Sequence, residues 1–210
     1  MNFPENNSPP KMLSKEWYLQ EDVTIAAKSL LGKVLVTELN GLKTSGIIVE
    51  TEAYNGIHDK ACHAYGGKRT PRTEVMYYRG GVAYVYLCYG IHHLFNIITN
   101  KEDIPDAVLI RAIQPVHEVQ TLLERRKMIK LKPTLTAGPG VLSSALGIKT
   151  ELSGITLSPD SGIWVEDHGV SFSEDEIQSG PRVGVSYAAE DALLPWRFSV
   201  KGNKWVSPSK

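Results

Sequence analysis

Two glutamates and a tyrosine alternate along one short segment, and their spacing places them together. Residues 47–54 read Ile-Ile-Val-Glu-Thr-Glu-Ala-Tyr, a pattern that predicts a β-strand. Side chains on a strand alternate between its two faces, so Glu50, Glu52 and Tyr54 share one face. Carboxylates beside an apolar sheet are unfavourable unless they are paired, hydrogen-bonded or used in chemistry. The segment is therefore a candidate for acid–base chemistry.

Two mechanisms are open to this pair of carboxylates. Alternate residues on a strand have α-carbons about 6.5 to 7 Å apart, which is near the carboxylate separation of inverting glycosidases. One carboxylate is also sufficient for N-glycosidic cleavage, because a single anion can stabilise an oxocarbenium-like sugar and accept a proton from the attacking water. Hydrolysis of a glycosidic bond, with one acid or two, is the reaction that the pattern favours.

A predicted hairpin over residues 84–99 carries an aromatic residue at its turn. An aromatic side chain at an exposed tip lacks the packing that normally explains it, so Tyr89 is a candidate wedge that unstacks bases and replaces an expelled nucleotide. Tyr86 lies opposite the residues just before Asn96, which would place a stacking ring beside an amide, as in a nucleobase pocket. The alternative is a tyrosine ladder that stabilises the sheet, with Tyr89 folded back onto it.

A glycine-rich basic loop precedes this hairpin. Residues 66–72 read Gly-Gly-Lys-Arg-Thr-Pro-Arg. Glycines let the backbone approach a phosphate closely, and Lys68, Arg69 and Arg72 supply positive charge, so the loop is a candidate contact with a DNA backbone. It lacks the spacing of a Walker loop. A solvated surface loop is the alternative.

Charge is balanced over the chain but unevenly placed. The 210 residues include 23 Lys or Arg and 23 Asp or Glu, so the formal net charge is zero. Basic residues outnumber acidic ones at 54–79 and 124–132, whereas acidic residues collect at 102–106 and 166–176. A neutral chain with this distribution can carry the basic face that a nucleic acid partner requires. Alternatively, residues 124–132 are simply the solvated side of a helix.

The sequence disfavours metal, disulfide and membrane functions. Four of the six histidines lie between residues 58 and 93, but no pair has the spacing of a helical metal site. Two cysteines are too few for a disulfide scaffold and form no Cys-x-x-Cys pattern, which favours a reducing compartment. No apolar run is long enough to cross a bilayer, and the first residues lack the features of a signal peptide. We therefore expect a soluble cytoplasmic protein with no metal and no membrane partner.

The elements that must position these residues predict an α+β fold. Residues 1–14 predict a flexible N-terminal tail, and residues 15–210 predict a single domain. Asp22 is a suitable N-cap for a helix over 23–31. The remaining patterns predict strands at 33–39, 47–54, 84–89, 91–99, 107–113, 155–157, 163–166, 183–185 and 197–200, and helices at 116–130 and 142–146. Strands joined by hairpins indicate a mostly antiparallel curved β-sheet with surrounding helices and a protruding β-hairpin.

Short motifs in order along almost the whole chain match one known family. They are Val-Glu-Thr-Glu-Ala-Tyr (49–54), His63, Gly-Gly (66–67), Thr-Pro-Arg (70–72), Tyr-Val-Tyr-Leu-Cys-Tyr-Gly (84–90), Asn96, Leu-Ile-Arg-Ala (109–112), Gly-Pro-Gly (138–140), Pro-Arg-Val-Gly-Val (181–185) and Pro-Trp-Arg-Phe (195–198). Through these motifs the chain resembles the alkyladenine (3-methyladenine) DNA glycosylase family. One departure is Val141, at a position where the family usually has lysine.

The resemblance implies a role for each matching catalytic and pocket residue. Glu52 would be the general base that activates water for attack at the sugar C1′, and Arg111 would position that water and a nearby phosphate. Tyr54 and His63 would stack on one face of the extruded base, with Tyr86 on the other.

Further roles follow for the residues around this pocket. Tyr89 would be the wedge that fills the vacated stack, and Asn96 would line the pocket and penalise the 2-amino group of guanine. Glu50 would be structural, which counts against the two-carboxylate mechanism. Lys68, Arg69 and Arg72 would contact the DNA backbone.

The function implied by the resemblance is that of a monofunctional DNA glycosylase. It would flip damaged purines, alkylated or deaminated, out of duplex DNA and hydrolyse the N-glycosidic bond, which initiates base excision repair. It would work as a monomer without cofactors, in the cytoplasm of a bacterial-type cell. An alkylated purine is cationic, so it stacks well on tyrosine faces and leaves readily. The alternatives are a DNA-binding module without chemistry and a glycosidase or nucleosidase for small sugars.

Overall fold

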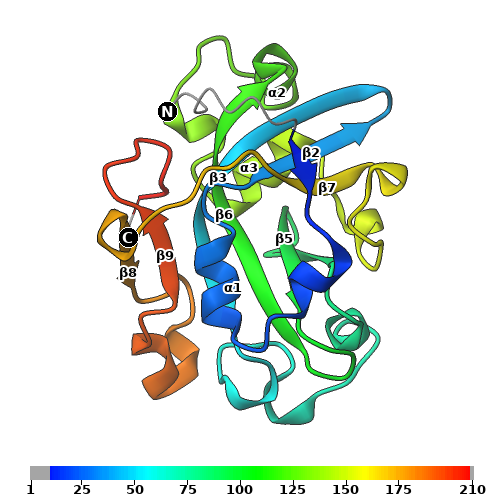
Figure 1. Ribbon diagram of the computed structural model, residues 1–210, viewed down its shortest axis with the longest axis vertical. Coiled ribbons are helices and arrows are strands. Elements are labelled where there is room, and N and C mark those ends of the chain that lie inside the picture. Colours follow the sequence, from blue (N-terminus) through cyan, green and yellow to red (C-terminus); the bar gives the residue numbers. More distant parts are fainter. Residues whose placement is uncertain (1–9, 209–210) are drawn as a thin grey trace.

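Nine strands form one curled antiparallel sheet in the computed structural model, which describes residues 10–208 (Figure 1). The strands of the main path, in spatial order, are β1 (Lys11–Met12), β7 (Ile163–Asp167), β2 (Val34–Leu39), β3 (Leu42–Tyr54), β6 (Asp106–His117), β5 (His92–Thr99) and β4 (Val82–Cys88). Two further strands, β8 (Ile177–Gly180) and β9 (Arg197–Val200), extend the sheet beside β3. The predicted α+β class with a mostly antiparallel sheet is confirmed.

Three α-helices and nine short 3₁₀ helices accompany the sheet in the described part of the chain. The α-helices are α1 (Val23–Ser29), α2 (Val119–Arg125) and α3 (Pro139–Leu146). The 3₁₀ helices are η1 (Lys15–Leu19), η2 (Gly56–His58), η3 (Tyr65–Gly67), η4 (Glu74–Tyr77), η5 (Pro133–Leu135), η6 (Thr150–Leu152), η7 (Pro159–Ser161), η8 (Glu174–Glu176) and η9 (Ser186–Leu193). The Asp22 carboxylate accepts from the backbone N–H groups of Thr24 and Ile25, which confirms the predicted cap of α1.

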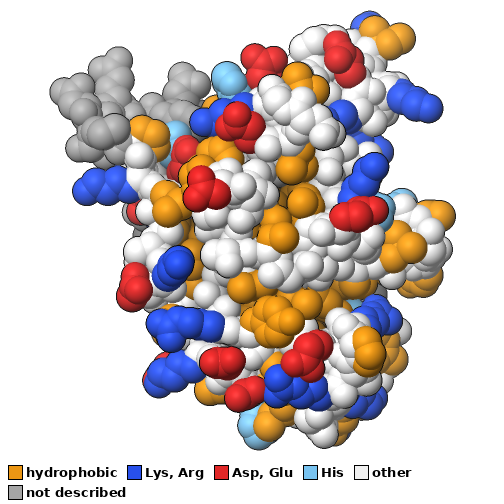
Figure 2. Space-filling model, turned by 90° about the vertical axis from the view of Figure 1, so that its right-hand side faces the viewer, with side chains coloured by type: hydrophobic (Ala, Val, Ile, Leu, Met, Phe, Trp, Pro, Cys, Tyr) orange, Lys and Arg blue, Asp and Glu red, His pale blue; other side chains and the backbone are white. Residues whose placement is uncertain are grey.

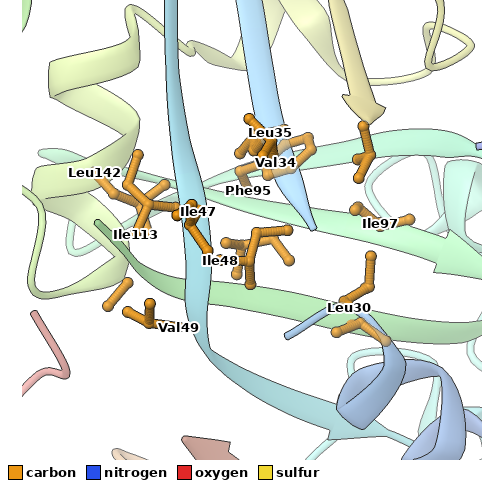
Figure 3. Close-up of a cluster of buried hydrophobic side chains, with 14 of the residues drawn as sticks. Leu30, Val34, Leu35, Ile47, Ile48, Val49, Phe95, Ile97, Ile113 and Leu142 are labelled. Carbon is orange, nitrogen blue, oxygen red and sulfur yellow. The ribbon is translucent and has the colours of Figure 1, made fainter. Parts of the chain in front are cut away.

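The main core lies between the sheet and helices α1 and α3. Figure 3 shows side chains from four strands and both helices meeting in one cluster. The labelled residues are Leu30, Val34, Leu35, Ile47, Ile48, Val49, Phe95, Ile97, Ile113 and Leu142. All of them are essentially excluded from solvent. Their burial supplies the main driving force for folding, because apolar area removed from water is favourable in proportion to its extent.

The two ends of β3 pair with different strands. Glu50 and Glu52 lie at the end where β9 replaces β2 as the neighbour. The first half of β3 pairs with β2, whereas Glu50, Thr51 and Glu52 pair with β9. The pairing of β3 with β6 shifts register on both sides of Glu50. Such irregularities re-aim side chains and increase the local twist of a sheet. The α1 helix is tied to the same stretch, because Thr51 Oγ1 donates to the Ala27 carbonyl at 2.9 Å.

Two hairpin turns have left-handed backbone at both central residues. Asn40 and Gly41, between β2 and β3, have φ of 55° and 74°. Tyr89 and Gly90, between β4 and β5, have φ of 51° and 73°. This is the geometry of a type I′ turn, in which Asn-Gly is the usual pair and a bulky aromatic is an outlier. The second turn therefore holds a tyrosine where the backbone disfavours one.

The predictions for the segment after residue 107 were partly wrong. The strand predicted at 107–113 is longer than expected, because β6 continues through Pro115 to His117 and pairs Pro115 with Gly46 at a register shift. A bulge tolerates proline, since the missing N–H is not needed there. The predicted helix over 116–130 is shortened to α2, and Lys127 ends it with φ of 51°. The apolar pattern continued to Ile129, but that side chain is 95% exposed and packs on nothing.

Three other boundaries differ from the predictions. The predicted strand at 155–157 forms only an isolated bridge between Thr156 and Val82. Residues 183–185 form no strand, because Gly184 has φ of 79° and breaks the extended backbone. The strand β8 was not predicted. Most of the predicted tail, residues 1–9, lies outside the described residues, but Lys11 and Met12 pair with β7 and so belong to the sheet.

Candidate active site

The Glu52 carboxylate is held by three donors at the buried end of β3. Its Oε1 atom accepts from the Val183 backbone N–H at 2.7 Å and lies 3.2 Å from Arg111 Nη1. Its Oε2 atom accepts from the Tyr54 hydroxyl at 2.8 Å. The residue is 0% exposed. In this conformation Oε1 has two donors and Oε2 accepts from the Tyr54 hydroxyl, with which a water molecule at Oε2 would compete.

Glu50 occupies a separate and more fully paired position on the same face. Its carboxylate accepts from Arg111 Nε at 2.8 Å and from the Ser207 N–H at 2.6 Å, and Arg197 Nε lies 3.0 Å away. Arg111 therefore lies between the two carboxylates. Burial alone lowers the pKa of Arg111, but the charges of Glu52 and Glu50 outweigh it and raise the pKa. A guanidinium shared in this way keeps its charge and fixes both carboxylates.

Strand register brings the catalytic candidate and the pocket candidates into one row. Glu52 lies opposite Leu109 of β6, Leu109 lies opposite Asn96 of β5, and Asn96 lies opposite Tyr84 of β4. Directly opposed residues of neighbouring strands point to the same face of the sheet. Tyr86 lies opposite Leu94, as predicted. The sheet thus carries Glu52, Asn96 and the tyrosine pair on one surface, although they are far apart in sequence.

His63 and the β4 tyrosines form an aromatic cluster next to this row. The His63 and Tyr86 ring centroids are 4.6 Å apart, at an interplanar angle of 73°. The Tyr84 and Tyr86 centroids are 5.6 Å apart. A base clamped between two rings needs about 7 Å between them, which is twice the ~3.5 Å contact distance of carbon atoms. His63 and Tyr86 are thus in direct contact here, and a base enters between them only after one of the rings moves.

The protonation of His63 follows from its surroundings. Burial and then the charge of Arg72 lower the pKa of His63 to about 4, so its ring is neutral at physiological pH. Nε2 lies 3.4 Å from Arg72 Nη2, which can only donate. Nδ1 therefore carries the proton and donates to the Tyr84 hydroxyl at 2.8 Å. Burial also raises the pKa of Tyr84 to about 12. The aromatic cluster is uncharged apart from Arg72, whose guanidinium lies 5.3 Å from the centre of the Tyr86 ring.

The Tyr54 ring packs against Arg182, which was not among the predicted site residues. The Arg182 guanidinium lies 4.8 Å from the centre of the Tyr54 ring and 5.1 Å from that of Trp196. It is neutralised by Asp59, with which it forms two hydrogen bonds. It also donates to the Ala53 carbonyl at 2.9 Å. The sequence signal was present in the motif at 181–185, which contributes both this arginine and the Val183 N–H that binds Glu52.

Asn96 is buried, and its amide nitrogen is fixed by the backbone. The nitrogen donates to the Tyr84 carbonyl at 3.1 Å and to the Leu94 carbonyl at 3.4 Å. Its side chain therefore cannot turn freely. Because Asn96 pairs with Tyr84, the amide lies beside the aromatic cluster, as the predicted pocket requires.

The β4–β5 turn presents an apolar tip to solvent. Tyr89 is 88% exposed and Ile91 is 71% exposed. The alternative in which Tyr89 folds back onto its sheet does not occur in this structure. A non-glycine residue in a left-handed backbone conformation costs on the order of 1 to 3 kcal/mol, and such strain gathers at functional sites. The turn therefore combines backbone strain with an exposed aromatic ring.

The three cations of the basic loop differ in whether a carboxylate of the protein already pairs with them. Arg69 is bound by Glu74 at 2.8 Å and by Asp103 at 2.7 Å, and its guanidinium lies 4.6 Å from the centre of the Tyr77 ring. Lys68 and Arg72 are exposed and have no carboxylate partner within the described residues. Figure 2 shows Lys and Arg side chains mixed with Asp and Glu side chains over the face that it presents. Lys68 and Arg72 are consequently the loop cations whose charge no described carboxylate neutralises, and Arg72 also contacts His63 and Tyr86.

Residues 10–208 contain no metal-ligand cluster, no disulfide and no membrane-spanning helix. Within this range no group of His, Cys, Asp and Glu side chains is arranged to hold a metal ion. Both cysteines are free thiols, Cys62 buried and Cys88 partly buried. In the same range no helix has the length and apolar character to traverse a membrane.

The fold and the site have the parts that a base-excising hydrolase needs. A buried glutamate lies beside an arginine, aromatic rings surround the adjoining surface, and an exposed tyrosine stands at a neighbouring turn. Such enzymes extrude the base from the stack and hold it on aromatic rings for attack.

Comparison with known proteins places the chain in such a class. The profile of the family described as Methylpurine-DNA glycosylase (MPG) matches residues 16–204. A protein of Clostridium acetobutylicum is 47% identical over 206 residues, which cover 94% of this chain and 98% of that protein. A protein of Chlamydia abortus is 48% identical over 188 residues, 89% of this chain and 97% of that protein. Both carry the name "Putative 3-methyladenine DNA glycosylase".

The chain belongs to the methylpurine-DNA glycosylase family. It is a hydrolase of N-glycosyl bonds, a DNA glycosylase that acts on alkylated bases. The resemblance seen in the sequence motifs is confirmed. Membership of an enzyme family with a DNA substrate favours this assignment over a binding module without chemistry and over a glycosidase for small sugars.

Proposed function

We propose that this protein is a monofunctional glycosylase that extrudes damaged purines from duplex DNA and hydrolyses the N-glycosidic bond with a water molecule activated by Glu52. Glu52 takes a proton from the water, and the water oxygen forms a bond to the sugar C1′. The bond from C1′ to the purine nitrogen breaks, and its electron pair leaves with the base. The product is an abasic site, which initiates base excision repair.

One observation carries this proposal, namely the pairing of Glu52 with Arg111 beneath the Tyr54 hydroxyl. The ion pair of Glu52 with Arg111 fixes the orientation of the carboxylate that would accept the proton of the water. Arg111 is fixed by Glu50 on its other side, so it is positioned before substrate arrives. Preorganised charges of this kind stabilise developing charge without reorganisation during the reaction.

Binding of the base must open the site. The Tyr54 hydroxyl occupies Oε2 of Glu52, and the His63 and Tyr86 rings are in contact. In our proposal the extruded purine separates these two rings and packs on Tyr54, and the water takes the place of the Tyr54 hydroxyl on Glu52. An alkylated purine is cationic, and its attraction to the tyrosine faces offsets the cost of this opening.

The remaining residues select and capture the lesion. Asn96 lines the pocket and hinders the 2-amino group of guanine. Tyr89 enters the duplex and fills the space of the extruded nucleotide, which an exposed aromatic ring at a turn can do. Lys68 and Arg72 contact the DNA backbone, whereas Arg69 acts indirectly by holding the loop through its ion pairs. The protein works as a monomer, since each of these groups comes from one chain.

The substrate range includes deaminated purines such as hypoxanthine. A neutral purine must gain a proton as it leaves, so its release should be slower than that of a cationic purine and should decline as pH rises. Parallel assays with methylated duplex DNA and with a duplex that contains one hypoxanthine measure this difference. Release from the methylated duplex alone would restrict the range to alkylated bases.

Replacement of Glu52 by glutamine tests the mechanism. Glu52→Gln keeps the shape of the side chain but removes the base, so release under single-turnover conditions should fall on the order of 10²–10⁴-fold. Binding to lesion-containing duplex should persist, and thermal melting verifies that the variant folds. Glu38→Gln is the matched control, because Glu38 is exposed on β2, and it should react like the wild type. Unimpaired release by Glu52→Gln would remove Glu52 from its role.

A further inference from the structure

A second cavity lies beside the hairpin tip, apart from the glutamates. Its volume is about 570 Å³. It is bounded by the start of β5, the end of α2, helix α3 and the segment that follows α3. Its lining residues with polar or charged side chains are Asn40, His92, His93, Arg125, Arg126, Ser144 and Lys149. Two arginines, a lysine and two histidines thus meet in a cavity that no aspartate or glutamate lines.

Arg126 is the least satisfied of these groups. Its Nε atom is buried and has no hydrogen-bond partner within residues 10–208, and no ion pair with a described carboxylate involves its guanidinium. A buried donor without a partner costs about 1 to 3 kcal/mol, and more when it is charged. The part of the Arg126 guanidinium that lines the cavity can meet an acceptor from outside the chain.

Arg125 adds a second charge that the protein leaves unneutralised. Its Nη1 atom donates to the Thr44 hydroxyl and to the Ala145 carbonyl, both at 3.2 Å, and both acceptors are neutral. The side chain is packed against Gly147, where a β-carbon would lie 3.2 Å from the Arg125 Cζ atom. Arg125 is therefore fixed in place with its charge uncompensated, and burial lowers its pKa.

The position of the cavity indicates its ligand. Ile91 and His92 line it, and they follow Tyr89 and Gly90 directly along the chain. If Tyr89 enters the duplex, the sugar–phosphate backbone of the DNA must pass within a few residues of the turn. Phosphate oxygens are multiple strong acceptors, and arginine donors match them in geometry.

We propose that this cavity, named here the α2–α3 cavity, binds a backbone phosphate of duplex DNA near the lesion through Arg126 and Lys149, with Arg125 supplying additional positive charge. The proposal rests on the proposed function of Tyr89 as a wedge. The α2–α3 cavity fixes the depth and register of the hairpin in the groove, because phosphate contacts position a protein on DNA without reading sequence. It also provides a basic surface on a chain whose net charge is zero.

The salt dependence of DNA binding tests this proposal. Each phosphate contact on duplex DNA contributes about 0.9 to the slope of log K against log salt concentration. Arg126→Gln should lower that slope by about 0.9 and weaken binding about 8-fold at 0.1 M salt, on damaged and undamaged duplexes alike. Lys149→Gln, at an exposed position, should act in the same direction. Lys130→Gln is the matched control, because Lys130 is an exposed cation of the same region outside the cavity. Equal slopes for Arg126→Gln and Lys130→Gln would overturn the proposal.

A neutral phosphate analogue locates the contact on the DNA. The affinities of the wild type and of Arg126→Gln are measured on duplexes that carry one methylphosphonate at successive positions around the lesion. At one or two positions the analogue should weaken the wild type and leave Arg126→Gln unaffected, because the contact is already lost. Equal losses for both proteins at every position would contradict a phosphate in the α2–α3 cavity.

These measurements test phosphate binding in the α2–α3 cavity independently of base release. Binding and its salt slope do not depend on base release, so they can be determined on undamaged DNA. If the wild type released no damaged base while its slope still exceeded that of Arg126→Gln, the proposed function would fail and the phosphate site would stand.

Discussion

The hydroxyl of Tyr54 donates a hydrogen bond of 2.8 Å to Oε2 of Glu52, two residues earlier on the same strand. The contact joins the ring expected to stack on the base to the carboxylate expected to activate water. Burial, followed by the charge of Glu52, raises the pKa of Tyr54 well above its ordinary value, so the hydroxyl keeps its proton and remains a donor. Before DNA binds, the carboxylate that we propose as the general base is therefore hydrogen-bonded by its own neighbour.

Removal of the Tyr54 hydroxyl should expose the Glu52 carboxylate while the aromatic ring of residue 54 remains. In Tyr54→Phe, Oε2 of Glu52 loses a donor, so the free energy of unfolding should fall by about 1 to 3 kcal/mol. Single-turnover base release at saturating DNA should be at least as fast as in the wild type, since water no longer competes with the hydroxyl. Tyr54→Leu, which also lacks the ring, should lose lesion binding. A Tyr54→Phe rate as low as that of Glu52→Gln would show that the hydroxyl is needed for catalysis.

The Tyr89 ring should matter only when a stack has to be opened. Tyr89→Ser should weaken capture of a lesion in duplex DNA by about 10-fold or more, because stacking on an aromatic side chain is worth about 1 to 3 kcal/mol per base. Capture of the same lesion in single-stranded DNA should change much less. Binding to both substrates, measured side by side, gives the comparison. Equal losses on the two substrates would exclude a wedge role. Leu87→Ser, on the same hairpin, serves as the control for loss of exposed apolar area.

Glu50 should act on stability rather than chemistry. It accepts from Arg111, Arg197 and Ser207, so Glu50→Gln removes the buried negative charge that pairs with both arginines. Breaking a buried ion pair from one side costs about 3 to 5 kcal/mol, which chemical denaturation should reveal. The rate of base release per folded molecule should fall less than 10-fold. If that rate instead matched Glu52→Gln at unchanged stability, the two-carboxylate mechanism would be restored.

Asp106 should make stability depend on pH. Burial raises the pKa of Asp106 from 3.8 to about 6 against the opposing hydrogen bond from Asn100, and its Oδ1 atom has no partner within the described residues. Because the folded-state pKa is the higher one, the contribution of Asp106 is fully present below pH 4 and is lost as pH rises through 6. The loss at pH 8 should be on the order of 3 kcal/mol.

Asp106→Asn should therefore flatten the dependence of unfolding free energy on pH between 4 and 8. Denaturation at several pH values measures the dependence for wild type and variant. Asp160→Asn, at an exposed position, is the control and should leave it unchanged. A wild-type protein whose stability rises steadily over this interval, with Asp106→Asn behaving identically, would rule out a buried Asp106 carboxyl with a raised pKa.

Local patterns were sufficient where an element is determined by its own residues. The cap at Asp22 and the alternation along β3 each depend on backbone preferences within a few residues, and both were predicted. The helix over 116–130 was predicted too long because its apolar pattern continues after Arg125, where the fold offers no surface to cover it. The strand at 107–113 was predicted too short because a register shift against β3 decides whether the missing N–H of Pro115 matters.

The sequence by itself determined the chemistry that the protein carries, namely which acids, rings and cations are present and which of them alternate on one strand. Only the tertiary structure decided how they are used. It placed Arg111 between Glu50 and Glu52, set Val183 against Glu52 across 131 residues, and left Arg126 without a partner. Contacts between distant segments depend on how strands pair and where bulges shift their register, and that information lies in the packed sheet rather than in any single segment.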